Sequence, residues 1–356
     1  MRVLVAPDKF AGTLTAVEAA EAIAEGWHRH APDDEVDLLP MSDGGPGFVD
    51  VLATALGGSR EPVVVRGPFG DPVPAEVLLV DDTAYVESAQ ACGLHLTGAE
   101  RAEEATTYGV GELVVAAREA GARTVVVGLG GSGTNDGGAG LLAALGATAD
   151  RPLDRGCAGL EGISTIELPD PGVALVAASD VDNPLTGLFG ATKTFGPQKG
   201  IPEERLPAVD GLLEGFAAAA GQRTALEKGA GAAGGLGYAL LLLGGERRAG
   251  LDLVAAATGL LERCRAADLV VTGEGAFDFS SRAGKVPYGV ATVAAEAIRP
   301  CVALAGAVLV GSREMRALGV ESAHSLVDLV GEERAFAEPA ASLAELAERV
   351  ARTWSR

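Results

Sequence analysis

The sequence has few aromatic residues and no long apolar run. Only 4% of its 356 residues are Phe, Trp or Tyr, whereas 48% are hydrophobic, so we expect a core of Ala, Val and Leu. No apolar run reaches the roughly 18 residues that a membrane-spanning helix requires. The N-terminal stretch MRVLVAPDKF lacks the apolar region and the small-residue cleavage site of a signal peptide. These absences predict a globular, cytoplasmic protein.

Cysteine and histidine are also scarce. The cysteines at 92, 157, 264 and 301 form no CxxC pair, so a zinc site or a disulfide framework is not expected and the thiols should be reduced core residues. The four histidines do not cluster with acids or with a serine. The nucleophile-elbow pattern GxSxG fails at Thr134, and the Walker A pattern GxxxxGK[ST] is absent. A P-loop nucleotide site is therefore excluded.

Basic residues are outnumbered, with 28 Lys and Arg against 49 Asp and Glu, which gives a net charge of −21. Sequence-independent binding to nucleic acid needs clustered cations, so nucleic acid and anionic membrane surfaces are not expected partners. Only five of the 28 basic residues are Lys, and Lys9, Lys193, Lys199 and Lys285 lie in Gly- or Pro-rich loops. An ammonium is a compact charge that suits a phosphoryl group. These lysines are candidate site residues, although each could also be a solvated surface charge.

Strands and helices alternate at both ends of the chain. A strand from Val3 to Ala6 precedes a helix that a capping box at Thr15 and Glu18 begins. Further strands are predicted at 36–39, 268–274, 302–306 and 323–329, with a closing helix over 343–353. Such alternation is typical of a parallel sheet, and the order 2-1-3-4-5 would put its switch point between the first and third strands. Ligands should bind there, near Asp8, Lys9, Glu274 and Asp278.

The middle of the chain has a different pattern. Residues 62–88 contain short β-rich pieces separated by Pro and Gly, which favour an antiparallel or mixed sheet. A helix–strand–loop–helix unit follows over 106–145, then a strand over 173–178 and helices from about 205 to 265. We therefore predict an α/β fold of two domains. Residues 1–60 and 262–356 form the domain with the parallel sheet, and 61–261 form an inserted domain with a mixed sheet.

A glycine-rich loop lies in 124-TVVVGLGGSGTNDGGAGLLAALG-146. Its Gly128-x-Gly130-x-x-Gly133 spacing follows a strand, opens a helix and precedes an acid, Asp150, as in a dinucleotide site. However, the pattern recurs at 229-GAGAAG-234, and the loop is not in the first βαβ unit. A nest of backbone amides that holds phosphates is the alternative that we favour. Its members are Gly130, Gly131, Ser132, Gly133, Thr134, Asn135, Gly137 and Gly138. Tight packing alone is a third interpretation.

Carboxylates follow several predicted strands. They are Asp8, Asp43, Asp136, Asp180, Asp182, Glu274 and Asp278. An Asp in such a position can hold Mg²⁺ through one or two oxygens or accept a proton from an attacking hydroxyl. A turn or a helix cap is the structural alternative for each of them.

Seven motifs in order resemble the glycerate kinase family of bacterial glyoxylate and aldarate breakdown. They are APDKF…GT, SDGGPG, GLGGSGTNDGGAG, SDVDNPLTG, FGPQKG, GAGAAGGLG and TGEGAFD…GKVPYGVA, from Val3 to about Gly306. The resemblance implies ATP-dependent phosphorylation of D-glycerate, usually to 2-phosphoglycerate, with Mg²⁺. It also implies two α/β domains, one of them flavodoxin-like (Rossmann-like), with the active site in the cleft between them.

With this resemblance we predict the following roles. Asp180, Lys9, Lys199 and Lys285 are catalytic, and the glycine-rich loop binds phosphate. The substrate site contains Asp8, Asp43, Gly44, Ser281 and Arg282. The metal ligands are drawn from Asp180, Asp43, Asp136 and Glu274.

Two other functions stay open. One is an NAD(P)-dependent oxidoreductase of small hydroxy acids. The other is a non-catalytic hydroxy-acid-binding protein, because Ala11 and Ala276 stand where the family often has Lys and Arg. D-Glycerate and ATP are the expected partners, and a homodimer is compatible with the sequence.

Overall fold

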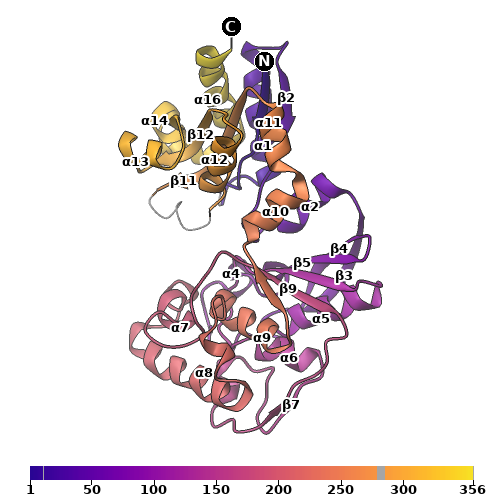
Figure 1. Ribbon diagram of the computed structural model, residues 1–356. Helices are drawn as coiled ribbons and strands as arrows, with labels where there is room; N and C mark the ends of the chain where they lie inside the picture. The colour runs from indigo at the N-terminus through magenta and orange to yellow at the C-terminus, as the bar shows by residue number, and fades with distance from the viewer. Residues whose placement is uncertain (11, 279–284, 356) are drawn as a thin grey trace. The chain divides into compact units, whose positions relative to one another are not determined.

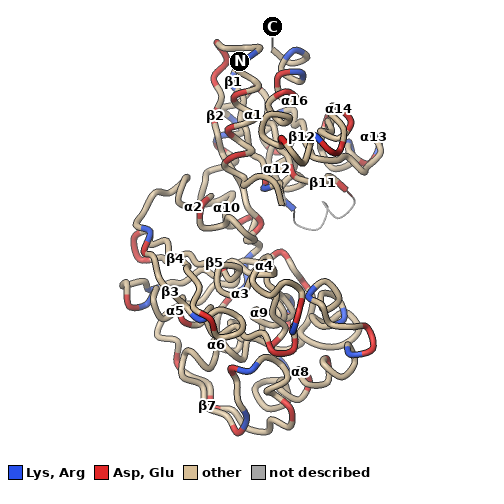
Figure 2. The backbone as a smooth tube through the Cα atoms, turned by 180° about the vertical axis from the view of Figure 1, so that it is seen from behind, with Lys and Arg blue, Asp and Glu red and all other residues tan. Residues whose placement is uncertain are grey.

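The structure is a computed structural model that describes residues 1–10, 12–278 and 285–355. The chain divides into two compact units (Figure 1). Unit 1 comprises Met1–Asp43, Asp50–Leu56 and Leu251–Arg356, and unit 2 comprises Gly44–Val49 and Gly57–Gly250. The domain limits expected from the sequence, at residues 61 and 261, stay a prediction. Acidic residues are spread over both units (Figure 2).

Unit 1 contains a five-stranded sheet in which all neighbouring strands are parallel. Its strands are β1 (Arg2–Val5), β2 (Glu35–Leu38), β11 (Leu269–Phe277), β12 (Cys301–Val308) and β13 (Ser322–Ser325). Their order is β13-β12-β11-β1-β2, which is the predicted 2-1-3-4-5 order. The predicted fold class and the switch point between β1 and β11 are therefore confirmed.

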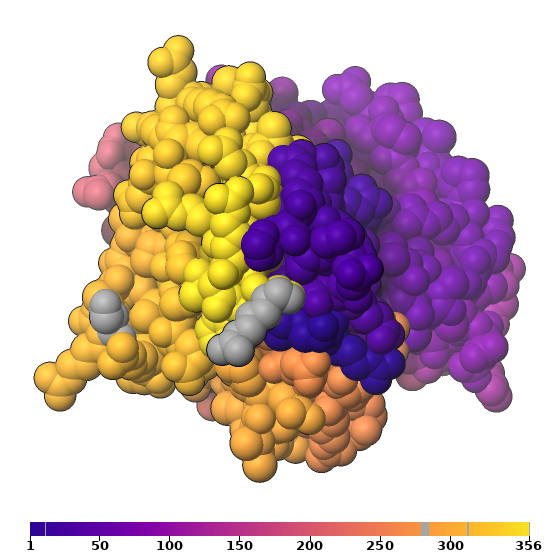
Figure 3. Space-filling view, turned by 90° about the horizontal axis from the view of Figure 1, so that it is seen from above, coloured from indigo at the N-terminus to yellow at the C-terminus, as the bar shows by residue number. Residues whose placement is uncertain are grey.

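This unit contains long and short helices. They are α1 (Ala16–His30), α2 (Phe48–Leu56), α10 (Gly250–Thr258), α11 (Leu260–Ala266), α12 (Val286–Glu296), α13 (Ser312–Ala317), α14 (Leu326–Val330), α15 (Glu332–Ala337) and α16 (Pro339–Trp354). Of these, α1, α11, α12, α13, α14 and α16 contact the strands of the sheet. The long helices α1 and α16 pack against each other and against the strand side chains of one face. Figure 3 shows the C-terminal segment directly against the N-terminal segment.

The first helix begins as the sequence predicts. The Thr15 side chain accepts a hydrogen bond from the Glu18 amide at 3.1 Å, and the Glu18 carboxylate accepts one from the Thr15 amide at 2.8 Å. This capping box satisfies two amides that the first helical turn leaves unpaired. Farther along α1, Gly26 lies against α16, where an added Cβ would come within 1.9 Å of the Ala344 carbonyl oxygen.

Unit 2 contains a six-stranded mixed sheet and a separate two-stranded hairpin. Its strands are β3 (Ser59–Arg66), β4 (Pro72–Val80), β5 (Thr83–Glu87), β6 (Thr124–Gly128), β7 (Thr148–Ala149), β8 (Ile166–Glu167), β9 (Ala174–Ala178) and β10 (Glu246–Arg248). The large sheet has the order β10-β9-β6-β5-β4-β3. The β5–β4 and β4–β3 pairs are antiparallel and the other pairs are parallel, so the predicted mixed sheet is confirmed.

The helices of unit 2 are mostly short. They are α3 (Ser88–Cys92), α4 (Leu94–Thr97), α5 (Tyr108–Glu119), α6 (Ala139–Ala144), α7 (Ala191–Phe195), α8 (Leu206–Ala220) and α9 (Leu236–Leu242), with 3₁₀ turns η1 (Cys157–Leu160), η2 (Pro197–Lys199), η3 (Glu203–Arg205), η4 (Thr224–Leu226) and η5 (Ala232–Gly235). A core of mainly Val, Leu and Ala lies between them and the sheet. All four cysteines are free and buried, as expected.

Three local predictions need correction. The strand predicted to end at 274 continues to Phe277, because β12 supplies pairing partners as far as Val308. The strand predicted over 323–329 ends at Ser325, whose side chain accepts a hydrogen bond from the Asp328 amide and so caps α14. The sequence interpretation also missed β10, which pairs with β9.

Candidate active site

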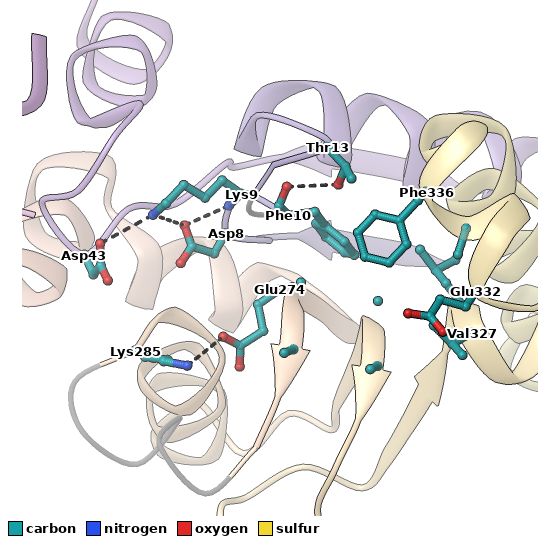
Figure 4. Close-up of a pocket in the computed structure, with 16 residues that line it drawn as sticks. Asp8, Lys9, Phe10, Thr13, Asp43, Glu274, Lys285, Val327, Glu332 and Phe336 are labelled. Atoms are coloured by element: carbon teal, nitrogen blue, oxygen red, sulfur yellow. Dashed lines mark hydrogen bonds and ion pairs between the residues drawn. The ribbon is translucent and has the colours of Figure 1, made fainter. Parts of the chain in front are cut away.

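The carboxyl end of β1 brings three predicted site residues together in unit 1. The chain leaves β1 with the Asp8 amide bonded to the Gly273 carbonyl oxygen of β11 at 2.8 Å. The Asp8 carboxylate then accepts a hydrogen bond from the Lys9 amide at 2.7 Å. The Lys9 ammonium lies 3.5 Å from a carboxylate oxygen of Asp8 and 3.8 Å from one of Asp43 (Figure 4). Asp8, Lys9 and Asp43 therefore form one charged cluster.

A second lysine lies across the switch point. Lys285 occupies the position just before α12, and its ammonium lies 3.6 Å from Glu274 and 3.7 Å from Asp278. Glu274 projects from β11 itself and its side chain is buried. Both predicted lysines of unit 1 therefore have carboxylates as neighbours, and these ion pairs fix the positions of the two ammonium groups.

Burial changes the chemistry of Asp8. Removal from water raises the pKa of this carboxyl from 3.8 to about 7, and the nearby Asp43 and Glu274 carboxylates push the pKa in the same direction. The Lys9 ammonium and amide oppose this rise in pKa. A carboxyl group with a pKa near neutrality can exchange a proton with a hydroxyl at physiological pH.

Both charged clusters line one pocket of about 620 Å³. The pocket also has an apolar part, which was not predicted from the sequence, with Phe10, Leu326, Val327, Ala335 and Phe336 among its walls. Figure 4 shows the charged residues on one side and Phe336, Val327 and Glu332 on the other. Neither Glu332 nor Phe336 directly follows a strand, so a search for polar residues at the ends of predicted strands could not find them.

In unit 2 the glycine-rich loop after β6 is packed backbone to backbone. The Gly130 amide donates to the Gly44 carbonyl at 3.0 Å, and an added Cβ at Gly130 would come within 2.4 Å of the Gly45 Cα. The Gly137 amide donates to Gly234 in the second glycine-rich segment at 2.9 Å. The tight-packing interpretation therefore holds for these glycines.

Further amides of this loop also have protein acceptors. The Gly133 amide donates to the Cys92 carbonyl at 2.8 Å, and the Gly138 amide donates to the Asp136 carboxylate at 2.9 Å. Helix α6, which follows, has only six residues. An anion at this loop would thus depend on groups other than the amides of residues 130, 133, 137 and 138.

Lys199 supplies such a group. It is only 2% exposed, and its ammonium donates to the Ser132 hydroxyl at 3.2 Å and to the Thr134 carbonyl at 2.7 Å. Burial lowers the pKa of Lys199 from 10.5 to about 8, because water no longer stabilises the charge. The structure therefore joins three predicted site residues: Ser132, Thr134 and Lys199.

Asn135 and Asp136 of the loop are fully buried. The Asp136 carboxylate accepts hydrogen bonds from the Thr107 amide and hydroxyl and from the amides of Gly138 and Gly140. These donors give Asp136 a structural role, and its role as a metal ligand stays a prediction. Burial raises its pKa, and the hydrogen bonds oppose that shift. The Asn135 amide nitrogen donates to Thr192, whereas its side-chain oxygen has no hydrogen-bond partner among the described residues.

Asp180 lies just after β9, as predicted. Gly44 lies at the same strand end, since an added Cβ there would approach the Ala178 carbonyl oxygen to 2.9 Å. Gly44 also has a φ of +91°, which disfavours any other residue. The neighbouring Asp182 pairs instead with Arg247 at 2.7 Å and Lys228 at 3.2 Å on the surface.

The described residues do not include the whole of the predicted substrate site. Ser281 and Arg282, predicted for the substrate carboxylate, lie outside the described residues. Within the described residues, no group of three or more His, Cys, Asp and Glu is placed to hold a metal ion. In the same part of the chain, no helix combines the length and the apolar character that a membrane span requires.

Comparisons with known proteins agree with this architecture. The model of the Glycerate kinase family matches residues 3–355. A glycerate kinase from Halalkalibacterium halodurans is 40% identical over 91% of this chain and 90% of its own length. The glycerate 2-kinase of Escherichia coli K12 is 36% identical over 93% of this chain and 92% of its own.

A solved structure supports the same assignment. A crystallised protein from Salmonella typhimurium LT2, assigned as glycerate kinase 2, superposes with a TM-score of 0.82 at 35% identity. The match covers 99% of this chain and 98% of that one. The chain therefore belongs to the glycerate kinase family, and with it the predicted enzyme class, an ATP-dependent kinase, is confirmed.

Proposed function

We propose that this protein transfers the γ-phosphoryl group of ATP to the 2-hydroxyl of D-glycerate and forms 2-phosphoglycerate with the help of Mg²⁺. The observation that carries the proposal is the pocket of unit 1, where Lys9 and Lys285 each lie beside carboxylates at the switch point of the sheet. Phosphoryl transfer depends mainly on positioning and on stabilising charge. A pocket with fixed ammonium and carboxylate groups provides both.

Each charged group has a proposed task. The Lys9 and Lys285 ammonium groups offset the negative charge that develops on the transferring phosphoryl group. Asp8, whose pKa is about 7, orients the substrate hydroxyl and accepts its proton. Ser281 and Arg282 are proposed for the glycerate carboxylate on sequence grounds alone.

Asp43 and Glu274 fit a site for Mg²⁺. Each supplies hard carboxylate oxygens, and both line the same pocket. Mg²⁺ is commonly held by one or two carboxylates, with phosphate oxygens and water as its other ligands. The ion, when bound, neutralises phosphate charge and does not require a dense cluster of protein ligands.

The glycine-rich loop of unit 2 is proposed to contact the phosphates through Ser132 and Lys199. Four of the loop amides already donate to protein acceptors, which favours the hydroxyl and the ammonium for this task. Asp180, at the end of β9, is proposed as a further catalytic residue or metal ligand.

A coupled ADP-release assay with D-glycerate, ATP and Mg²⁺ tests the proposal, and phosphorus NMR of the product distinguishes 2- from 3-phosphoglycerate. We expect turnover that requires glycerate and is lost when EDTA removes Mg²⁺. Glycerate binding without ADP release would contradict the proposal in favour of a binding protein. Thermal protection by NADH and not by ATP would favour an oxidoreductase.

A further inference from the structure

We infer that the apolar part of the unit 1 pocket binds the adenosine half of ATP, with the adenine ring against Phe336. This inference rests on the proposed function, since it assigns a place to the phosphoryl donor. It goes beyond that function because the sequence contains no motif for the nucleotide base.

The size of the pocket suits a nucleoside better than the acceptor. Its volume of about 620 Å³ lies within the 300–1,000 Å³ typical of sites for small molecules. Glycerate is a three-carbon acid whose every carbon bears oxygen, so it has no apolar surface to bury. An adenine ring has two flat apolar faces that gain from leaving water.

The aromatic walls have the chemistry that a base requires. Phe336 on α15 is 63% exposed, although it is a large apolar side chain that lines a pocket. Phe10 is only 2% exposed, and its amide bonds to the Leu14 carbonyl at 2.8 Å, which holds that segment in place. Bases stack on aromatic rings with a useful gain in affinity. Phe336 therefore offers an accessible ring face to a base, and the buried Phe10 contributes to the fixed apolar wall of the same pocket.

The sheet order separates the two ends of the pocket. Asp8 and Asp43 come from the segments that follow β1 and β2, and Glu274 comes from β11. On the other side of the pocket, Ala307, Val327 and Phe336 come from β12, α14 and α15. ATP has the same polarity, with a flat apolar ring at one end and a polyanion at the other. Glu332 is the charged residue on the apolar side, and its negative charge would repel phosphate. The phosphates therefore point toward Lys9 and Lys285.

The floor between these ends is open. Ala276 of β11 and Ala307 of β12 are register partners on neighbouring strands, and both line the pocket. Their methyl groups leave space above the strand ends where longer side chains would fill it. The ribose of a bound nucleotide would lie over this part.

A steady-state comparison of Phe336→Ala with the wild-type enzyme tests the inference. We expect the KM for ATP to rise about tenfold or more, since loss of base stacking weakens binding by factors of this size. The KM for glycerate and kcat should stay within about twofold, and Phe336→Trp should restore the KM for ATP. Leu226→Ala is the control, because Leu226 is also a large exposed apolar residue and lies outside the pocket.

Competition experiments locate the effect on the nucleotide. Adenosine should compete with ATP in the wild type and lose potency in Phe336→Ala, whereas inorganic triphosphate should compete equally well in both. An unchanged KM for ATP, or an equal rise in both KM values, would overturn the inference while leaving the kinase activity intact. If no kinase activity is found, titration calorimetry of ATP with wild type and Phe336→Ala still tests the binding site by itself.

Discussion

Lys199 illustrates how strongly a single side chain can depend on its surroundings. Its ammonium is buried beside the Ser132 hydroxyl, and burial brings its pKa to about 8. Burial of a cation that is close to losing its proton lowers the stability of the folded protein. Residues with such shifted pKa values are concentrated at functional sites. This supports a catalytic rather than a structural role for Lys199.

Lys199→Met should lower kcat by about 100-fold or more while the protein remains folded, because the substitution removes a preorganised charge beside the glycine-rich loop. Lys228→Met is the matched control, since Lys228 is exposed and pairs with Asp182 on the surface. Circular dichroism and turnover would be measured for both variants. A Lys199→Met enzyme with kcat within twofold of wild type would remove Lys199 from the reaction.

Asp180 and Asp182 offer a second matched pair two residues apart. Asp180→Asn should reduce turnover by about 100-fold or more, in the range for loss of an acid–base group. Asp182→Asn should leave turnover within about twofold, because exposed ion pairs such as those of Asp182 contribute little. Near-normal turnover of a folded Asp180→Asn variant would show that Asp180 has no chemical role.

The raised pKa of Asp8 leads us to expect a particular dependence of the stability of the protein on pH. Because its folded pKa of about 7 lies above the unfolded value of 3.8, its contribution to stability is fully present below about pH 4. That contribution declines as the pH rises and is lost once the pH passes about 7. Asp8→Asn should therefore be more stable than the wild type at pH 8, by at most about 4 kcal/mol.

Urea unfolding of both proteins at pH 4 and pH 8, without divalent cations, measures this difference. The Asn side chain can still accept the Lys9 amide bond, so the variant keeps that contact. The stability gain should shrink toward zero at pH 4. A gain of equal size at both pH values would contradict the raised pKa of Asp8.

The sequence predicted some residues of the candidate site better than others. Asp8, Lys9 and Glu274 were found because the carboxyl ends of adjacent parallel strands must meet. Asp136 was predicted as a metal ligand from its place after a strand, and that role stays a prediction. Its hydrogen bonds from Thr107 could not be predicted because Thr107 is distant in sequence. The packing of Gly130 on Gly45 depends on a similar long-range contact, which no local motif reveals.

At the scale of elements, the packing of α1 on α16 is closest at Gly26. An added methyl group would meet the Ala344 carbonyl at 1.9 Å, so Gly26→Ala must push the helices apart. Overpacking of this kind commonly costs about 1–3 kcal/mol. Differential scanning calorimetry should show a lower Tm for this variant.

Gly215→Ala in α8 is the contrasting control. Gly215 is exposed on the helix, and among the described residues no atom beyond its own stretch of helix lies within 4 Å of an added Cβ there. The same substitution should therefore raise stability by about 0.5–1 kcal/mol through helix propensity. Equal effects of the two substitutions would contradict the close packing of α1 on α16.

The elements themselves differed in how well they could be predicted. The order of the parallel sheet follows from regular alternation and short connections, which leave few possible topologies. The extension of β11 to Phe277 depends on pairing with β12, and the end of β13 depends on one hydrogen bond of Ser325. Such tertiary and side-chain effects override the local apolar pattern.

At the scale of the whole molecule, the net charge of −21 should oppose the approach of anionic substrates. Raising the ionic strength from about 10 mM to about 150 mM shortens the screening length from about 30 Å to about 8 Å. We therefore expect kcat/KM for both ATP and glycerate to increase severalfold over this range. Steady-state kinetics at a series of salt concentrations would measure this change. A decrease in kcat/KM with added salt would mean that the lysines near the site dominate the electrostatic potential that the substrates meet.

The interleaved course of the chain has a consequence for biosynthesis. Strand β1 needs β11 as a neighbour, and the 57–250 segment of unit 2 is made between them. At about 5–20 residues per second, a ribosome needs on the order of 10–40 s to reach β11 after residue 57. During that interval unit 2 can fold while β1, α1 and β2 wait with apolar surface uncovered. Nascent chains of this protein should therefore be clients of ribosome-associated chaperones until β11 emerges.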